Sequence, residues 1–188
     1  MINMIYFTSD LHFSHNKEFL YAPRGYSSAE DMNNAILENW NSIITPEDDV
    51  YILGDLMLSN NDEGLKCIKL LKGKLHIIRG NHDSDNRIEL YRNCWNVVEI
   101  SEGKFFRYGK YHFYLTHYPC LISNLDTDKP LHVRMINLCG HTHTQDKFVD
   151  FNKGLIYHCE LDAHNCYPIS IEQIITDVKE ECERRNDG

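Results

Sequence analysis

Apolar residues in the first half of the chain follow two alternating patterns. Residues 4–8, 50–53 and 75–78 are apolar runs of strand length, which is typical of buried strands. Between them, residues 29–44 and 62–71 space their apolar side chains along one face of a helix. The order strand, helix, strand, helix, strand favours an α/β sheet with parallel neighbours.

The expected helices have recognisable ends. Ser27-Ser28-Ala29-Glu30 is typical of a capping box at the first helix, Asp62 is the expected N-cap of the second, and Gly73 follows as its C-cap. A last helix is expected to begin with a cap at Ser170-Ile171-Glu172-Gln173, and the charged tail from Glu180 onward is expected to fray.

The second half of the chain changes character. Residues 97–100, 104–107 and 111–115 are short runs separated by glycine-containing turns, and they are predicted to form hairpins. Residues 135–139 and 155–159 are predicted as two further strands.

Five of the predicted strands end in polar tags that contain Asp, Asn or His. The tags are Asp10-Leu11-His12, Gly54-Asp55, Gly80-Asn81-His82-Asp83, His117 and Gly140-His141-Thr142-His143. Strand ends line the ligand crevice of an open α/β sheet, so the tags are expected to converge on one spot. Carboxylate, amide and imidazole donors bind first-row divalent metals. The sequence therefore predicts a metal site at this edge of the sheet.

The spacing within two of the tags supports a shared pocket. Side chains at i and i+2 point the same way in extended backbone, so Asp10 is expected to face with His12, and His141 with His143. The glycine in three of the tags is expected to let the backbone turn sharply off its strand.

All five tags, in this order, resemble the motifs DxH, GDxxD, GNH(D/E), H and GHxH of the calcineurin-like metallophosphoesterases. The resemblance spans about residues 4 to 170, and residues 10–15 and 39–41 look like a small prokaryotic or phage-type branch. It implies a four-layer α/β/β/α sandwich with two mixed sheets flanked by helices. Leu58 departs from the pattern because it replaces the second Asp of GDxxD, which puts the hydrogen bonding around Asp55 in doubt.

The resemblance also implies a site for two metal ions that share Asp55 as a bridging ligand. The ligands of one metal would be Asp10, His12, Asp55 and His143, and those of the other Asp55, Asn81, His117 and His141. His82 would act as the catalytic proton donor to the leaving oxygen, with Asp83 orienting its ring. Mn, Fe, Zn, Co and Ni all suit these ligands.

Two further residues are candidates for substrate binding. Arg24 could bind a substrate phosphate through two parallel hydrogen bonds, although a plain surface role is the alternative. His15 lies just past the first motif and could touch the substrate. The loops at residues 15–28 and 119–134 are expected to form the rim of the pocket.

Composition restricts the function further. The formal net charge of −9 disfavours an extended groove for nucleic acid, so a small phosphate ester is the expected partner. The seven cysteines form no CxxC pair, and residues 1–7 are too short for a secretory segment, which favours reduced thiols in the cytoplasm. Since the chain has no long apolar run, repeat or linker, a membrane span is not expected and residues 1–188 are expected to form one domain.

The favoured function is hydrolysis of a small, nucleotide-like phosphodiester, or of a phosphomonoester, by a metal-bridging hydroxide. Two metals about 3.5–4 Å apart would clamp the phosphate oxygens, and proton donation by His82 would contribute about 10²–10⁴-fold in rate. The alternatives are a nuclease acting on nucleic-acid ends and a non-catalytic metal-binding scaffold for a partner protein. The oligomeric state stays open.

Overall fold

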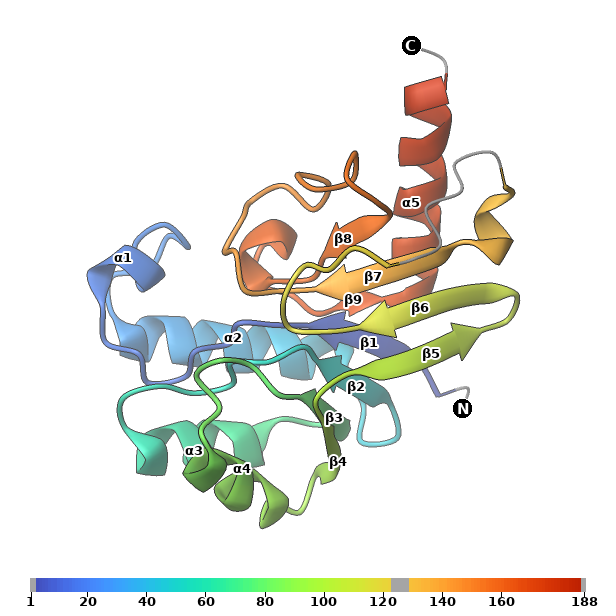
Figure 1. Cartoon of the computed structure of the whole chain (residues 1–188). Helices are drawn as coiled ribbons and strands as arrows, with labels where there is room; N and C mark the ends of the chain where they lie inside the picture. Colours follow the sequence, from blue (N-terminus) through green and yellow to red (C-terminus); the bar gives the residue numbers. More distant parts are fainter. Residues whose placement is uncertain (1–2, 123–128, 187–188) are drawn as a thin grey trace.

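Two mixed β-sheets form the centre of the fold, with helices packed around them (Figure 1). The computed structural model describes residues 3–122 and 129–186. Four parallel strands and one antiparallel edge strand make up the first sheet, which has the order β4-β3-β2-β1-β9. These strands are β1 (Ile5–Thr8), β2 (Asp49–Ile52), β3 (Lys74–Ile78), β4 (Val97–Ser101) and β9 (Ile169–Ser170).

The second sheet has the order β5-β6-β7-β8, with an antiparallel β5–β6 hairpin followed by parallel pairing from β6 to β8. Its strands are β5 (Lys104–Tyr108), β6 (Tyr111–Leu115), β7 (Met135–Cys139) and β8 (Ile156–His158). The helices are α1 (Glu18–Tyr21), α2 (Ala29–Ile43), α3 (Asn61–Leu70), α4 (Asp85–Arg92) and α5 (Ile171–Asn186), with 3₁₀ turns η1 (Leu131–Val133) and η2 (Leu161–His164). The predicted class, two mixed sheets flanked by helices, is confirmed.

Two apolar cores hold these layers together. The first lies between the first sheet and α2, α3 and α4, and Trp40 is fully buried in it. The second lies between the two sheets and also takes the apolar side of α5, so Phe7 of β1 and Phe113 of β6 belong to one cluster. Residues of β2 therefore alternate between the cores, with Val50 and Ile52 in the first and Tyr51 in the second.

Several sequence expectations need correction. The run at residues 97–100 does not form a hairpin with the next strand, because β4 pairs in parallel with β3 and the chain then crosses to the second sheet. Helices α1 and α4 lie where none was expected. The tail is helical to Asn186, and Glu181 is paired with both Arg184 and Arg185, so the expected fraying is wrong over residues 180–186.

The helix caps also differ from expectation. The N-cap of α2 is Ser28 rather than Ser27, and its side chain accepts a hydrogen bond from the Asp31 N–H at 3.0 Å. The N-cap of α3 is Asn60 rather than Asp62, because the side-chain oxygen of Asn60 accepts hydrogen bonds from two backbone N–H groups of the first turn. Ser170 accepts from the N–H of Gln173 at 3.2 Å, as predicted for the start of α5. No helix within the described residues is long and apolar enough to cross a membrane.

Asp177 fixes α5 to the second sheet, and its charge should make stability depend on pH. Burial alone would raise the pKa of Asp177, but hydrogen bonds from Lys147 (2.6 Å), Tyr157 (2.6 Å) and Gln173 (2.8 Å) lower it. A lowered pKa in the folded state stabilises the fold above the unfolded-state pKa of about 3.9, and this contribution is lost as pH falls through the folded-state value.

We therefore expect Asp177→Asn to lower the free energy of unfolding by about 1.5–3 kcal/mol at pH 7. The difference from the unsubstituted protein should shrink below about pH 4. Urea unfolding at pH 7, 5 and 3 measures it, and a difference that stays constant across these values would contradict the assignment. Asp62→Asn, an exposed change on α3, is the control.

Candidate metal centre

The carboxyl ends of β1, β2 and β3 in one sheet and of β6 and β7 in the other lie at the same side of the molecule. Backbone hydrogen bonds hold the following segments against one another. The N–H of Asp10 donates to the Gly54 carbonyl at 3.0 Å, and the N–H of Gly140 donates to the His117 carbonyl at 2.9 Å. The N–H of His141 donates to Asp10 Oδ2 at 2.8 Å and so connects the two sheets.

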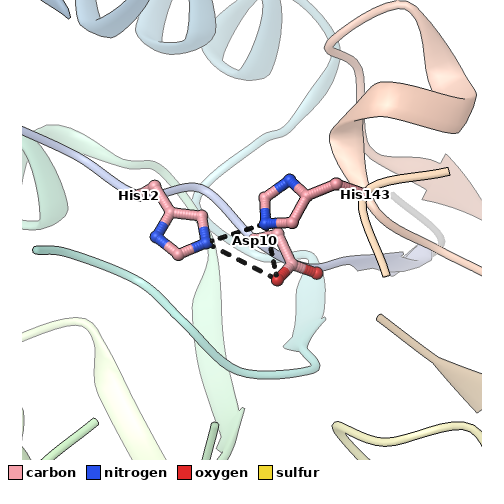
Figure 2. Close-up of side chains that lie close together, drawn as sticks. All are labelled: Asp10, His12 and His143. Atoms are coloured by element: carbon pink, nitrogen blue, oxygen red, sulfur yellow. Dashed lines mark hydrogen bonds and ion pairs between the residues drawn. The ribbon is translucent and has the colours of Figure 1, made fainter. Parts of the chain in front are cut away.

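Asp10, His12 and His143 form the first cluster, and Figure 2 shows their side chains pointing toward a common point. The two Nε2 atoms are 3.1 Å apart, and each lies within 3.7 Å of Asp10 Oδ1. This oxygen is buried and finds no hydrogen-bond partner among the described residues. The other oxygen of Asp10 is used internally, because it accepts from Ser9 Oγ at 2.6 Å and from the His141 N–H.

Asp55 lies between this cluster and a second one. Its Oδ2 is 3.7 Å from His12 Nε2 and 3.6 Å from His117 Nε2, whereas its Oδ1 accepts from the His82 N–H at 2.9 Å. Asn81 Oδ1 lies 2.8 Å from His117 Nε2 and 2.9 Å from His141 Nδ1. All seven expected ligands therefore lie close together, with the carboxylate of Asp55 between the two clusters.

The donor chemistry fits a pair of cations. His117 Nδ1 lies 2.8 Å from the Leu53 carbonyl, which can only accept, so Nδ1 carries the proton and the lone pair of Nε2 faces the cluster. The buried oxygen of Asp10 without a partner is the kind of atom that a metal would satisfy. Carboxylate, amide and imidazole ligands suit several first-row metals and do not single one out.

The two buried carboxylates respond differently to this environment. Burial would raise the pKa of Asp10, but the neighbouring His12, His143 and His117 outweigh it and lower the value to about 2. The pKa of Asp55 is raised, first by burial and also by the charge of Asp10, against the opposing effect of nearby histidines. In the absence of added positive charge, the two carboxylates therefore compete for the same stabilisation.

Ligand-bearing segments adopt unusual backbone conformations. Five candidate ligands lie in the left-handed region, with φ of 57° at Asp10, 48° at His12, 57° at Asp55, 77° at His141 and 50° at His143. The pairs at i and i+2 do converge, but the argument from extended backbone was wrong.

Of the three motif glycines, only Gly54 has a positive φ that side chains rarely adopt. Gly54 has φ of +96°, which favours glycine. At Gly80 and Gly140 the reason is space. A Cβ at Gly80 would lie 2.2 Å from Asp55 Oδ1, and one at Gly140 would lie 2.1 Å from Ser9 Oγ.

Comparison with known proteins agrees with this geometry. The family model described as Calcineurin-like phosphoesterase superfamily domain matches residues 4–158. The chain belongs to this superfamily. An uncharacterized protein of Methanocaldococcus jannaschii is 31% identical over 176 residues, covering 91% of this chain and 89% of the relative. The gene 66 protein of a Mycobacterium phage is 27% identical, covering 94% of this chain and 98% of the relative.

A similar fold is found in a solved structure. A protein of unknown function from Aquifex aeolicus superposes with a TM-score of 0.71 at 24% identity, and the match covers 93% of this chain and 99% of that one. At this level of identity the likeness shows the fold alone.

Asp83 has a different position from the one expected of a residue that orients the His82 ring. It is 1% exposed, and its carboxylate accepts from the backbone N–H groups of Asp55 (2.8 Å), Leu56 (3.3 Å) and Gly80 (2.9 Å). The Tyr91 hydroxyl donates to it at 2.9 Å. Asp83 therefore joins the second and third phosphoesterase motifs, and its bonds support Asp55 in the absence of the second motif's usual Asp.

Arg24 is also used inside the protein. Its side chain is 1% exposed and donates to both oxygens of Asp162, at 3.0 and 2.7 Å, and to the Asp10 carbonyl at 2.8 Å. Asp162 Oδ2 in turn lies 3.1 Å from His143 Nδ1. These contacts do not support the expected binding of a substrate phosphate, because the guanidinium is committed to the carboxylate that orients a candidate ligand.

Glu160 and Asp162 were missed as site residues. Glu160 is fully buried, lies 3.0 Å from His158 Nδ1, and accepts from the Thr142 hydroxyl at 2.8 Å. It thereby anchors the residue between two candidate ligands. The rule that found the other tags could have found this one, since both acids closely follow the predicted strand at residues 155–159.

His15 and His82 lie beside the centre, as expected. The ring centroid of each is 5.5 Å from that of His12, and the side chain of His82 is 43% exposed. Burial, followed by the neighbouring His12 and His82, lowers the pKa of His15 to about 4. Of the rim expected at residues 119–134, residues 123–128 lie outside the described part of the chain.

Bound metal should stabilise the fold through Asp55. We expect Mn²⁺ added to chelator-treated protein to raise the free energy of unfolding by about 2.7 kcal/mol at a concentration one hundred times its dissociation constant. Asp55→Asn should remove most of this effect and lower the metal content, whereas Asp62→Asn should behave like the unsubstituted protein. Thermal scans and elemental analysis measure the two quantities. Equal stabilisation of both variants would contradict a bridging position for Asp55.

Asp162 should matter for affinity without being a ligand. Asp162→Asn is expected to weaken metal binding about 10–100-fold, because His143 loses the carboxylate that fixes its tautomer and orientation. Competition with a fluorescent chelator measures the affinity, again with Asp62→Asn as the matched control. Unchanged affinity would show that His143 needs no such support.

Proposed function

We propose that this protein is a dinuclear metal-dependent phosphoesterase that hydrolyses a phosphodiester or a phosphomonoester, and that a small, nucleotide-like phosphodiester is the favoured substrate. The observation that supports it best is the convergence of Asp10, Asp55, Asn81 and four histidines from five segments at one place. When bound, the cations would polarise the phosphate and activate a water molecule as nucleophile.

The chain's own residues supply positioning and a proton. His82 lies 3.9 Å from Asp55 Oδ2 with its ring partly exposed, so it can reach the leaving oxygen of a phosphate held at the cluster. Its backbone is fixed on both sides, because its N–H donates to Asp55 Oδ1 at 2.9 Å and its carbonyl accepts from Arg87 at 2.6 Å. A proton from this ring would neutralise the charge that develops on a poor leaving group.

The shape of the cavity supports a small substrate. A cavity of about 420 Å³ opens over His12, Asp55, His82, His141 and His143, which is within the usual range for small-molecule sites of roughly 300–1,000 Å³. With a net charge of −9, the positive charge for an anionic substrate would come from the cations rather than from a basic groove.

The experiment is a metal-dependent assay on two p-nitrophenyl esters and a dinucleotide. With Mn²⁺, the protein should hydrolyse bis-p-nitrophenyl phosphate faster than p-nitrophenyl phosphate. On a dinucleotide, whose alkoxide leaving group needs a proton, His82→Ala should reduce kcat about 10²–10⁴-fold with metal content retained, and the loss should be smaller on the p-nitrophenyl esters. His112→Ala, at the opposite end of β6, should not reduce kcat on any of these substrates.

Three outcomes distinguish the alternatives. No hydrolysis of any of these substrates, with metal bound, would favour the scaffold. Full activity of His82→Ala on the dinucleotide would remove the proton-donor role. Preferential cleavage of labelled oligonucleotide ends would favour the nuclease.

A further inference from the structure

We propose that Phe19 is a stacking platform for an aromatic base of the substrate, so that the preferred ester is one that carries a nucleobase. This inference rests on the proposed function and adds a substrate class to it. The observation behind it is a large aromatic ring, exposed to solvent, on the wall of the cavity that contains the metal centre.

Phe19 is held in place by its neighbour rather than by its own burial. On the single turn of α1, Leu20 is 5% exposed and packs into the first core, whereas Phe19 is 73% exposed. The ring of Phe19 packs edge-on against His15, with centroids 5.7 Å apart and planes at 86°. An edge-to-face contact covers at most one face of the Phe19 ring, so a planar group could stack on the other.

The ring of Phe19 lies close to the candidate metal centre. Phe19 lines the same cavity as His12, His82 and His143, and Leu20 and Leu58 complete its apolar side. Figure 1 shows α1 beyond the ends toward which β6 and β7 run. An ester bound with its phosphate at the cluster would thus have one substituent directed at an apolar, aromatic wall.

The departure at Leu58 agrees with this arrangement. The family motif has an Asp at this position, and an acid there would add negative charge to a cavity meant for an anion. Leu58 instead presents carbon to the cavity that Phe19 lines. Single exposed apolar residues are ordinary on protein surfaces. Here, however, two leucines and a phenylalanine line the same cavity as candidate metal ligands, so they form an apolar wall beside the site. A nucleobase is the planar group that occurs in phosphodiesters.

The test compares two substrates with the same leaving group. Thymidine 5′-(p-nitrophenyl) phosphate and methyl p-nitrophenyl phosphate share the p-nitrophenyl group and differ in the other substituent, which is a nucleoside in the first and a methyl group in the second. For the Mn²⁺-loaded protein, the kcat/KM ratio of the two should favour the nucleoside, and Phe19→Ala should reduce this ratio about 5- to 150-fold. The loss is expected in KM rather than in kcat, because stacking is the same in the ground and transition states. Phe19→Trp should retain the preference.

Binding provides a readout that does not depend on turnover. Calorimetry should show that thymidine 5′-monophosphate binds more tightly than methyl phosphate, and that Phe19→Ala removes most of the difference. Trp95→Ala is the matched control, because Trp95 is 70% exposed but precedes the amino end of β4, whereas the candidate ligands follow the carboxyl ends of the parallel strands.

The outcomes separate the two proposals. Equal binding of both phosphates, or a Phe19→Ala variant that keeps the preference, would overturn the platform while hydrolysis of the methyl ester supports the phosphoesterase. If neither ester is hydrolysed, the proposed function is wrong, and the binding comparison still decides whether Phe19 stacks on a base.

Discussion

The burial of Asp10 and Asp55 beside each other is the constraint on which the site depends. These carboxylates are 0% and 2% exposed, and both approach the Nε2 atom of His12. Two buried negative charges are unfavourable unless positive charge or protons compensate for them. The raised pKa of Asp55 reflects that competition, since burial and the charge of Asp10 both oppose its ionisation. Cations at this point would relieve it, which makes metal binding and stability parts of one equilibrium.

Holding the ligands in this arrangement uses several more buried acids. Asp83 binds the backbone of the second and third motifs, Asp162 orients His143, and Glu160 holds Thr142 between two candidate ligands. These contacts offset the left-handed backbone at five ligands, where each such residue costs on the order of 1–3 kcal/mol. Part of the acidic character of the chain thus belongs to buried carboxylates that support the candidate metal centre, so the net charge is not only a property of the surface.

The features that could be predicted from the sequence were those set by local pattern and strand order, whereas contacts between residues far apart along the chain could not be predicted. Strand ends in parallel sheets share an edge, so tags such as Asp10-Leu11-His12 could be placed together from order alone. Asp83 could not be placed in the same way, because adjacency to His82 suggested a contact with its ring, whereas the carboxylate turns to the backbone of Asp55. The partner of Arg24 is 138 residues away and was invisible to any local pattern. Likewise, the pairing of β4 is decided by the sheet edge available to it, which no turn sequence records.

Arg24 also connects the segment that carries Phe19 to the candidate metal centre. The segment that contains α1 leaves the centre after His12 and returns at Arg24, which donates to the Asp10 carbonyl and grips Asp162. Both ends of this short segment are therefore fixed to residues that hold or orient candidate ligands. A side chain on α1 has little freedom to drift relative to the cluster, and that is what a stacking platform needs if it is to align an ester with the reacting groups. If Phe19 stacks on a base as proposed, the buried guanidinium would serve substrate binding indirectly, by holding the segment that carries Phe19 in place.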